Sequence, residues 1–203
     1  MCKVLCFTSR ELCREDFLER IRLLAGASPA GVVLREKDLS EQEYLVLARQ
    51  VQKICERWHV PCILHGFADA AIKLHAKAVH LPLPVLRGLT QAQKAAFSCI
   101  GASCHCVEEA QEAQALGCTY LTAGHIFETG CKRGLPGRGV QFLKDVADAV
   151  EIPVFAIGGI TPETVKSLRG TGAKGVCIMS AAMQRGDVRG YLNQLERGMQ
   201  GGL

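Results

Sequence analysis

Eight short apolar segments, separated by stretches with helical periodicity, constrain the fold of this chain most strongly. Each has about the length of a strand, and most are continuously apolar, as expected for strands that are buried on both faces. The segments are KVLCFTS (3–9), GVVLRE (31–36), PCILHG (61–66), KAVHLP (77–82), SCIGAS (98–103), TYLTAG (119–124), PVFAIGG (153–159) and GVCIMS (175–180).

The stretches between these segments predict helices, most clearly over 14–25, 41–58, 107–116 and 161–170. In the last of these, Thr161 suits the N-cap, Pro162 the first helical position and Gly170 the end. Strict alternation of strand and helix predicts a parallel sheet, and eight units predict closure into a single (β/α)8 barrel domain over residues 1–203. An open flavodoxin-like sheet is the alternative, but it usually has fewer strands.

Charge and hydropathy exclude several classes of partner. The net charge is +4, the basic residues form no run, and aromatic residues make up 5%, so we expect no nucleic-acid partner. No segment approaches the roughly 18 apolar residues that a membrane-spanning helix needs. The N-terminal apolar run is too short for a signal peptide.

The cysteines point to a reducing compartment. Their number is odd, 11, and no CxxC pair occurs. The cluster Cys104-His105-Cys106 matches no familiar zinc site. We therefore expect a cytoplasmic protein without disulfides and without a metal site.

In such a barrel, chemistry is expected at the carboxyl ends of the strands. Gly158 and Gly159 stand between the seventh strand and a capped helix, where backbone N–H groups and the helix dipole bind phosphate. Met179 and Ser180, after the eighth strand, add further backbone donors. This pairing favours a phosphate site over a mere tight turn.

Charged and titratable residues follow other strands. Arg35 and Lys37 should point the same way, with Glu36 opposite, and two cations suit a carboxylate or a phosphate. A solvated charged turn is the alternative. His105 follows the fifth strand and could act as an acid–base group, although a packed histidine is the commoner case. His65 and His80 we interpret as packed.

The segment GHIFETGCKRGLPGRGV (124–140) is a long loop rich in glycine and charge. Its cations Lys132, Arg133 and Arg138 could reach an anion. A solvated loop without function is the alternative.

This segment, together with LREK (34–37), SCHC (103–106), AIGGITPET (156–164) and MSAAM (179–183), resembles the thiamine phosphate synthase/TenI family. The resemblance implies a single (β/α)8 barrel that binds a thiazole phosphate. The segment 124–140 resembles specifically the thiazole tautomerase branch.

Several positions depart from the synthase pattern. Synthases of the family have an Asn-Asp pair after the third strand and an Asp after the fourth, which hold magnesium and the pyrimidine pyrophosphate. Here the corresponding residues are His65-Gly66 and the carboxylate-free segment HLPLPVLRG. Val33 replaces the glutamine of the synthase QLREK motif, and Cys131 replaces the second threonine of a pair whose first member is Thr129.

The resemblance, with these departures, implies a metal-free isomerase that moves a proton to aromatise a carboxythiazole phosphate. His105 would be its acid–base residue, and no cofactor would be needed. The implied substrate-binding residues are Arg35, Lys37, Thr129, Gly158, Gly159, Met179 and Ser180. A non-catalytic binder of thiazole phosphate is the alternative, and a synthase is disfavoured because magnesium needs oxygen ligands. A homo-oligomer is compatible with the sequence.

Overall fold

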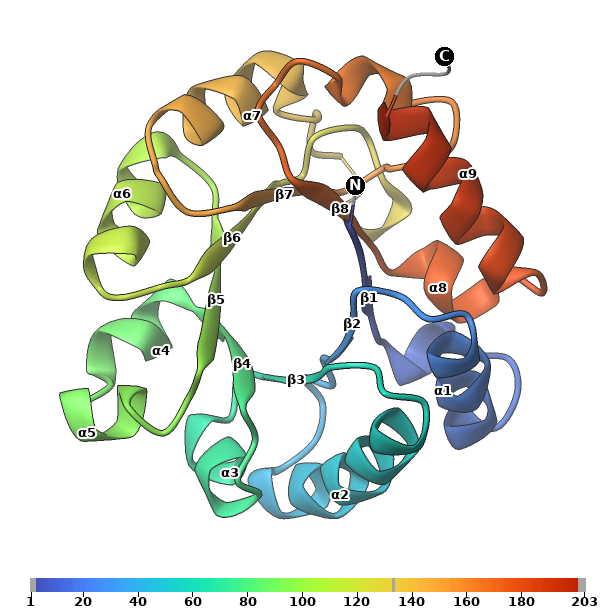
Figure 1. Cartoon of the computed structure of the whole chain (residues 1–203), viewed down its shortest axis with the longest axis vertical. Coiled ribbons are helices and arrows are strands. Elements are labelled where there is room, and N and C mark those ends of the chain that lie inside the picture. The colour runs from blue at the N-terminus through green and yellow to red at the C-terminus, as the bar shows by residue number, and fades with distance from the viewer. Residues whose placement is uncertain (1–2, 133, 201–203) are drawn as a thin grey trace.

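A computed structural model describes residues 3–132 and 134–200, and its eight parallel strands close into a barrel surrounded by helices (Figure 1). Each strand pairs with its neighbours in chain order, and β1 pairs with β8 to close the ring. The predicted (β/α)8 architecture is confirmed, and the open flavodoxin-like alternative is wrong. None of the described helices has the length and apolar character needed to cross a membrane.

All eight expected strands are present, and each is shorter than its apolar segment except β5, which has the same length and is shifted by one residue. They are β1 (Lys3–Phe7), β2 (Gly31–Leu34), β3 (Cys62–His65), β4 (Ala78–Pro82), β5 (Cys99–Cys104), β6 (Tyr120–Gly124), β7 (Val154–Ile157) and β8 (Gly175–Ile178).

The helical elements follow the strands in turn. They are η1 (Arg10–Leu12), α1 (Phe17–Gly26), α2 (Glu41–Arg57), α3 (Ala68–Lys73), α4 (Leu83–Gly88), α5 (Gln91–Lys94), α6 (Val107–Ala115), η2 (Gly130–Lys132), α7 (Gly139–Asp148), η3 (Val165–Leu168), α8 (Ser180–Gln184) and α9 (Val188–Gln200), where η marks a 3-10 helix.

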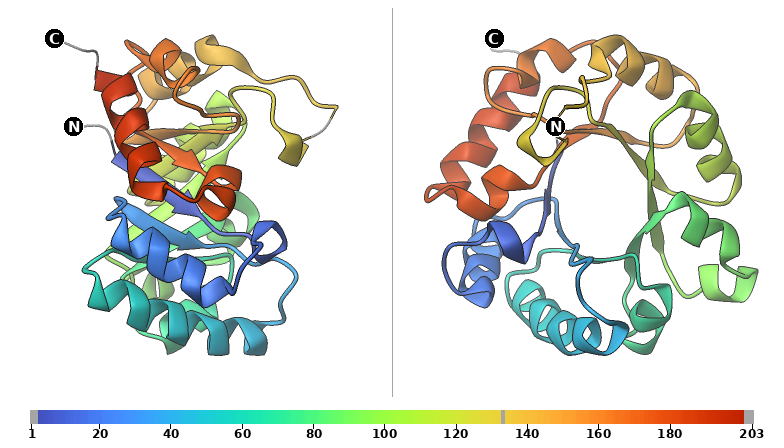
Figure 2. Two further views of the ribbon diagram at one scale, coloured as in Figure 1. Left: turned by 90° about the vertical axis from the view of Figure 1, so that its right-hand side faces the viewer. Right: turned by 180° about the vertical axis from the view of Figure 1, so that it is seen from behind.

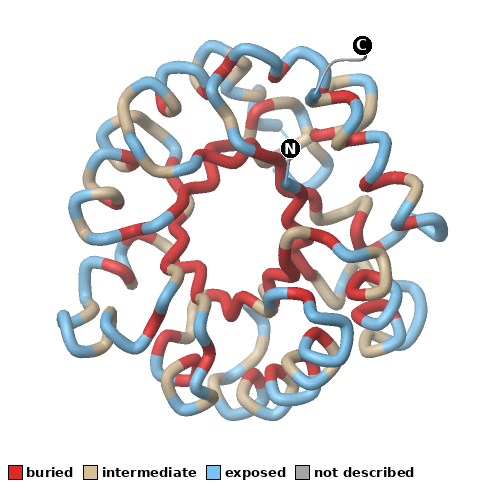
Figure 3. The backbone as a smooth tube through the Cα atoms, in the orientation of Figure 1, coloured by how far each residue is buried: buried red, intermediate tan, exposed pale blue. Residues whose placement is uncertain are grey.

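The strands are buried on both faces, as their continuous apolar character predicts (Figure 3). Alternate side chains point outward to the helices or inward to the barrel axis. Outward residues such as Val4, Val32 and Leu64 join one large core with the helices. Inward residues such as Leu5 and Phe155 form a second, smaller cluster inside the ring.

Local signals fix where the helices begin. Ser40 and Glu43 form a reciprocal capping box at the start of α2, and Asp16 accepts the Glu19 N–H at the start of α1. The expected helix over 161–170 is wrong, because the structure forms only the short 3-10 helix η3 there. Thr161 does accept the Thr164 N–H, at 3.3 Å, but this turn does not continue as an α-helix.

The closure of the barrel depends on the close approach of the β8 backbone at Gly175 to the β1 backbone at Lys3. A Cβ atom placed there would lie 2.1 Å from the Lys3 carbonyl oxygen on the adjacent strand. We therefore expect Gly175→Ala to lower the free energy of unfolding by about 1–3 kcal/mol, through overpacking between two strands that cannot move apart.

Urea denaturation measures this loss, and Gly88→Ala is the control. Gly88 ends α4 and an added Cβ would meet no atom within 4 Å. The control should unfold at the wild-type urea concentration or slightly above it. Equal midpoints for the two variants would contradict the proposed constraint.

Candidate functional site

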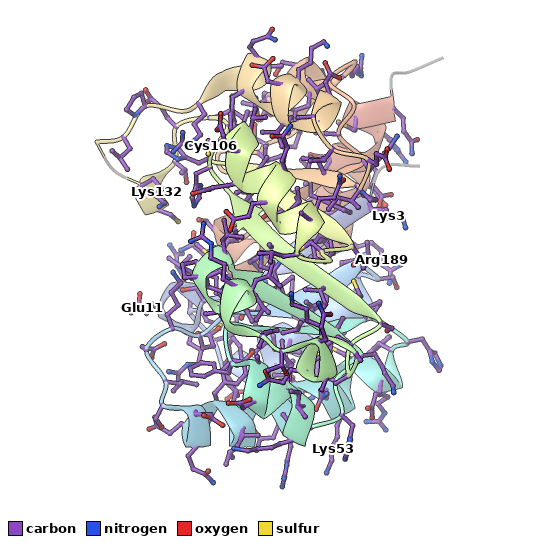
Figure 4. All side chains as sticks on the ribbon, turned by 90° about the vertical axis from the view of Figure 1, so that its left-hand side faces the viewer. Lys3, Glu11, Lys53, Cys106, Lys132 and Arg189 are labelled. Carbon is purple, nitrogen blue, oxygen red and sulfur yellow. The ribbon has the colours of Figure 1, made fainter. Side chains whose placement is uncertain are left out.

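The carboxyl ends of the strands surround a cavity of about 800 Å³. Figure 4 shows Lys132 on this side of the molecule, opposite Lys3, which begins β1 on the other side. All eight residues singled out as catalytic or substrate-binding line the cavity: Arg35, Lys37, His105, Thr129, Gly158, Gly159, Met179 and Ser180. The structure therefore brings them together, as the barrel topology requires.

The charged side chains after β2 alternate in direction, as predicted. Arg35 and Lys37 line the cavity, whereas Glu36 is buried on the other side. Glu36 accepts a hydrogen bond from the Thr8 hydroxyl at 2.6 Å and another from the Arg10 N–H at 2.9 Å. The Glu36 carboxylate is thus hydrogen-bonded away from the cavity. Arg35 and Lys37 therefore face the cavity without this carboxylate as a counter-charge.

Three cations gather at the rim of the cavity without paired carboxylates. Arg35, burial and Lys132 together lower the pKa of Lys37, with Arg35 having the largest effect. Within residues 3–132 and 134–200, Arg35, Lys37 and Lys132 form no ion pair. Like charges held together raise their mutual energy, and a bound anion relieves that repulsion. The rim is therefore suited to a phosphate or pyrophosphate.

Gly158 and Gly159 are required by the packing of the loop that follows β6. Both have positive φ, and a Cβ at Gly158 would lie 2.3 Å from the Cβ of His125. A Cβ at Gly159 would lie 2.5 Å from the Glu128 carbonyl oxygen. The two glycines thus let this loop lie against the end of β7, which leaves their backbone at the cavity wall.

The absence of an α-helix after β7 corrects part of the phosphate argument. No helix dipole points from η3 into the cavity, because η3 begins six residues beyond Gly159 and has only four residues. After β8, Ser180 begins the short helix α8, and its hydroxyl lies 3.4 Å from the thiol of Cys131. The phosphate site proposed at these loops therefore depends on backbone N–H groups and on the rim cations.

His105 follows β5 at the cavity wall. Its Nδ1 lies 2.9 Å from the Gly124 carbonyl oxygen, and its backbone N–H donates to Glu109 at 2.6 Å. A carbonyl can only accept, so Nδ1 carries the proton in this contact and a neutral ring keeps Nε2 as an acceptor.

The described parts of the loop, 124–132 and 134–140, extend beyond the end of the barrel, as the yellow segment in Figure 2 shows. Of the two expected anion contacts that the structure describes in this loop, Lys132 lines the cavity. Arg138 instead stacks over Phe142 at 5.4 Å, and Arg133 lies outside the described residues. Arg185, which the sequence analysis did not single out, lines the cavity and stacks over Tyr191 at 5.1 Å.

Four adjacent strands contribute polar side chains to the interior beneath the rim, namely His65, His80, Ser103 and Thr122. His80 is fully buried, with Nδ1 2.9 Å from the Tyr120 hydroxyl and Nε2 2.9 Å from the Ser103 hydroxyl. Both histidines are packed, as predicted, but the sequence did not predict the hydrogen-bond partners of His80. Their positions opposite each other in the β3–β4 register were the available signal.

A metal site is not apparent among these groups. Within the described part of the chain, no three His, Cys, Asp or Glu side chains cluster so that they could hold a metal ion. Burial raises the pKa of the Cys104 thiol to about 12, and Cys106 caps α6 by accepting the Glu109 N–H. Ten cysteines of the described residues are free thiols.

Comparison with known proteins connects this chain to thiamine biosynthesis. A family model described as thiamine monophosphate synthase (TMP-TENI) matches residues 4–182. The thiamine-phosphate synthase of Syntrophomonas wolfei is 33% identical over 197 residues, which cover 94% of this chain and 92% of the relative. Thiamine-phosphate synthase 2 of Streptococcus pneumoniae is 34% identical over 179 residues, covering 86% and 83%. The structure of thiamine phosphate pyrophosphorylase from Pyrococcus furiosus has a TM-score of 0.81 and 26% identity, covering 97% and 95%.

These findings correct the expected activity. The relatives carry the name of a synthase, which is a transferase, so the expectation of a thiazole tautomerase, an isomerase, is contradicted. That expectation gave most weight to one loop and to missing carboxylates, whereas the similarity to synthases extends over nearly the whole barrel. The chain belongs to the TMP-TENI family, described as thiamine monophosphate synthase.

Proposed function

We propose that this protein is a transferase of the thiamine-phosphate synthase kind, which joins a pyrimidine to a thiazole phosphate and releases pyrophosphate. The observation that carries the proposal is the group of cations Arg35, Lys37 and Lys132, which face one cavity without paired carboxylates. The names of its relatives support the same reaction class.

The transfer needs an anion site for each substrate. We assign the phosphate of the thiazole to the backbone around Gly158, Gly159, Met179 and Ser180, which together line one wall of the cavity. Thr129 belongs to the loop above this wall. We assign the pyrophosphate to the rim cations, where charge-assisted hydrogen bonds from guanidinium and ammonium groups are strong.

The electron balance of the transfer explains why these cations matter. The thiazole nitrogen attacks the methylene carbon of the pyrimidine, a carbon–nitrogen bond forms, and the carbon–oxygen bond breaks with its electron pair on the pyrophosphate. Negative charge therefore grows on the leaving group, and positioned cations stabilise it more in the transition state than in the substrate. No proton leaves a carbon atom in this step, so His105 serves as a wall residue that hydrogen-bonds the Gly124 carbonyl.

Magnesium, which the resemblance implied for synthases, does not fit the protein groups present. His65 and Gly66 occupy the place of the Asn-Asp pair and offer no carboxylate. Of the nearby acids, Glu36 is engaged by Thr8 and Arg10, and Glu109 by the His105 N–H. We therefore route no step through a protein-bound metal.

Two narrower expectations stay predictions. The assignment to the TenI branch, as a grouping of sequences and not as an activity, depends on the segment 124–140. The cytoplasmic location depends on the odd number of cysteines and on the lack of a CxxC pair in the sequence.

The direct test mixes the protein with the pyrimidine pyrophosphate and thiazole phosphate and follows thiamine phosphate by chromatography and pyrophosphate by ³¹P NMR. We expect product from the wild type, and a kcat/KM lowered roughly 10- to 100-fold in Lys37→Met, which loses a charged hydrogen bond. Lys53→Met is the control, because Lys53 is exposed on α2 and does not line the cavity. Product formation no faster than in protein-free buffer would contradict the proposal.

Metal binding gives a second test, made without substrate. Mn²⁺ added to the protein labelled with ¹⁵N should leave the amide signals of Gly66, Ser103 and His105 unbroadened, because no carboxylate set is available to bind it. Saturable broadening centred on His65 and Gly66 would show that a metal site exists there after all.

A further inference from the structure

The floor of the cavity differs in chemistry from its cationic rim. It is formed by Phe7, His65, Ser103 and Thr122, all of which line the cavity, and none of them is charged at neutral pH. Ile157 and Cys177 complete it with apolar surface. A site with this lining suits an uncharged planar ring that carries hydrogen-bonding atoms.

His65 is the histidine of this floor that lines the cavity. Its residue is only 7% exposed and lines the cavity, and its ring interacts with its own backbone rather than with the polar side chains of the neighbouring strands. Burial first, then Arg35 and Lys37, lower its pKa to about 3. At neutral pH the ring is therefore an imidazole with one N–H donor and one nitrogen acceptor.

The neighbours of His65 hold its ring in one orientation. It stacks on His80, with the ring centroids 5.6 Å apart and the planes 17° apart, and the edge of Phe7 packs against it at 6.5 Å. His80 cannot turn away freely, because Tyr120 and Ser103 bind its two ring nitrogens. A neutral imidazole that is held in one orientation at a cavity wall can form a directed hydrogen bond to a ligand without first having to be ordered.

We infer that His65 binds the uncharged nitrogen heterocycle of the substrate through an in-plane hydrogen bond, and that His80 is the positioning residue that orients it. The inference relies on the proposed function for the identity of the heterocycle, which is the pyrimidine or the thiazole. It divides the cavity into a neutral floor that recognises the ring and a cationic rim that recognises phosphate.

The test uses heterocycles without phosphate, so that the rim makes no contribution. The pyrimidine alcohol and the thiazole alcohol are titrated separately into wild type, His65→Phe and Lys132→Met, with inorganic pyrophosphate as a third ligand. Phenylalanine keeps a flat ring against His80 but cannot form the hydrogen bond. We expect His65→Phe to weaken binding of one alcohol about tenfold and to leave pyrophosphate binding unchanged. We expect Lys132→Met to weaken pyrophosphate binding and to leave binding of both alcohols unchanged.

Wild-type protein with ¹⁵N-labelled histidine gives an independent measurement if His65→Phe does not fold. The bound alcohol should shift the ring nitrogens of His65 by several parts per million, with smaller changes at His80. Loss of binding for the pyrimidine alcohol or for the thiazole alcohol identifies which ring occupies the floor.

The inference is overturned if His65→Phe binds both alcohols as tightly as the wild type, or if neither alcohol shifts the His65 signals. Its failure is distinguishable from that of the proposed function. Wild-type transfer activity together with unaltered alcohol binding in His65→Phe would overturn the inference alone. Alcohol binding lost in His65→Phe without any transfer activity would overturn the function alone.

Discussion

Closure of the parallel sheet between β1 and β8 is the constraint on which the rest of this structure depends. Lys3 pairs with Gly175 and Cys6 with Ile178 across that seam. Because all strands run in one direction, closure places every carboxyl end at the same mouth, and the candidate site assembles from loops far apart in sequence. Gly175 permits the seam, since any side chain there would collide with the Lys3 carbonyl.

The rim and the floor of the cavity differ in charge. The rim concentrates cations whose repulsion lowers the pKa of Lys37, which prepares it for an anion. The floor keeps His65 and His80 neutral through burial, with both pKa values lowered. The two regions adjoin, since the rim cations themselves help to keep His65 unprotonated. A substrate with a phosphate at one end and a neutral ring at the other matches this arrangement.

The sequence predicted the fold well because strands buried on both faces leave an unmistakable apolar signature. It also predicted eight candidate site residues that prove to line one cavity, since barrel topology alone brings strand ends together. It failed over 161–170, where good capping signals at Thr161 did not lead to an α-helix. The role of His65 could not be read from its apolar surroundings, because stacking and hydrogen-bond partners come from strands distant in the chain. The predicted tautomerase activity was wrong because the prediction gave most weight to one loop and to the missing carboxylates. The similarity to synthases extends over nearly the whole chain.

Protein-observed NMR with thiazole phosphate tests the central claim most directly, namely that a phosphorylated substrate binds at the carboxyl ends of the strands. The account predicts saturable shifts of the Gly158, Gly159 and Ser180 amide signals, with the Lys3 end of the barrel unaffected. Shifts confined to the amino ends of the strands, or none at millimolar ligand, would contradict it.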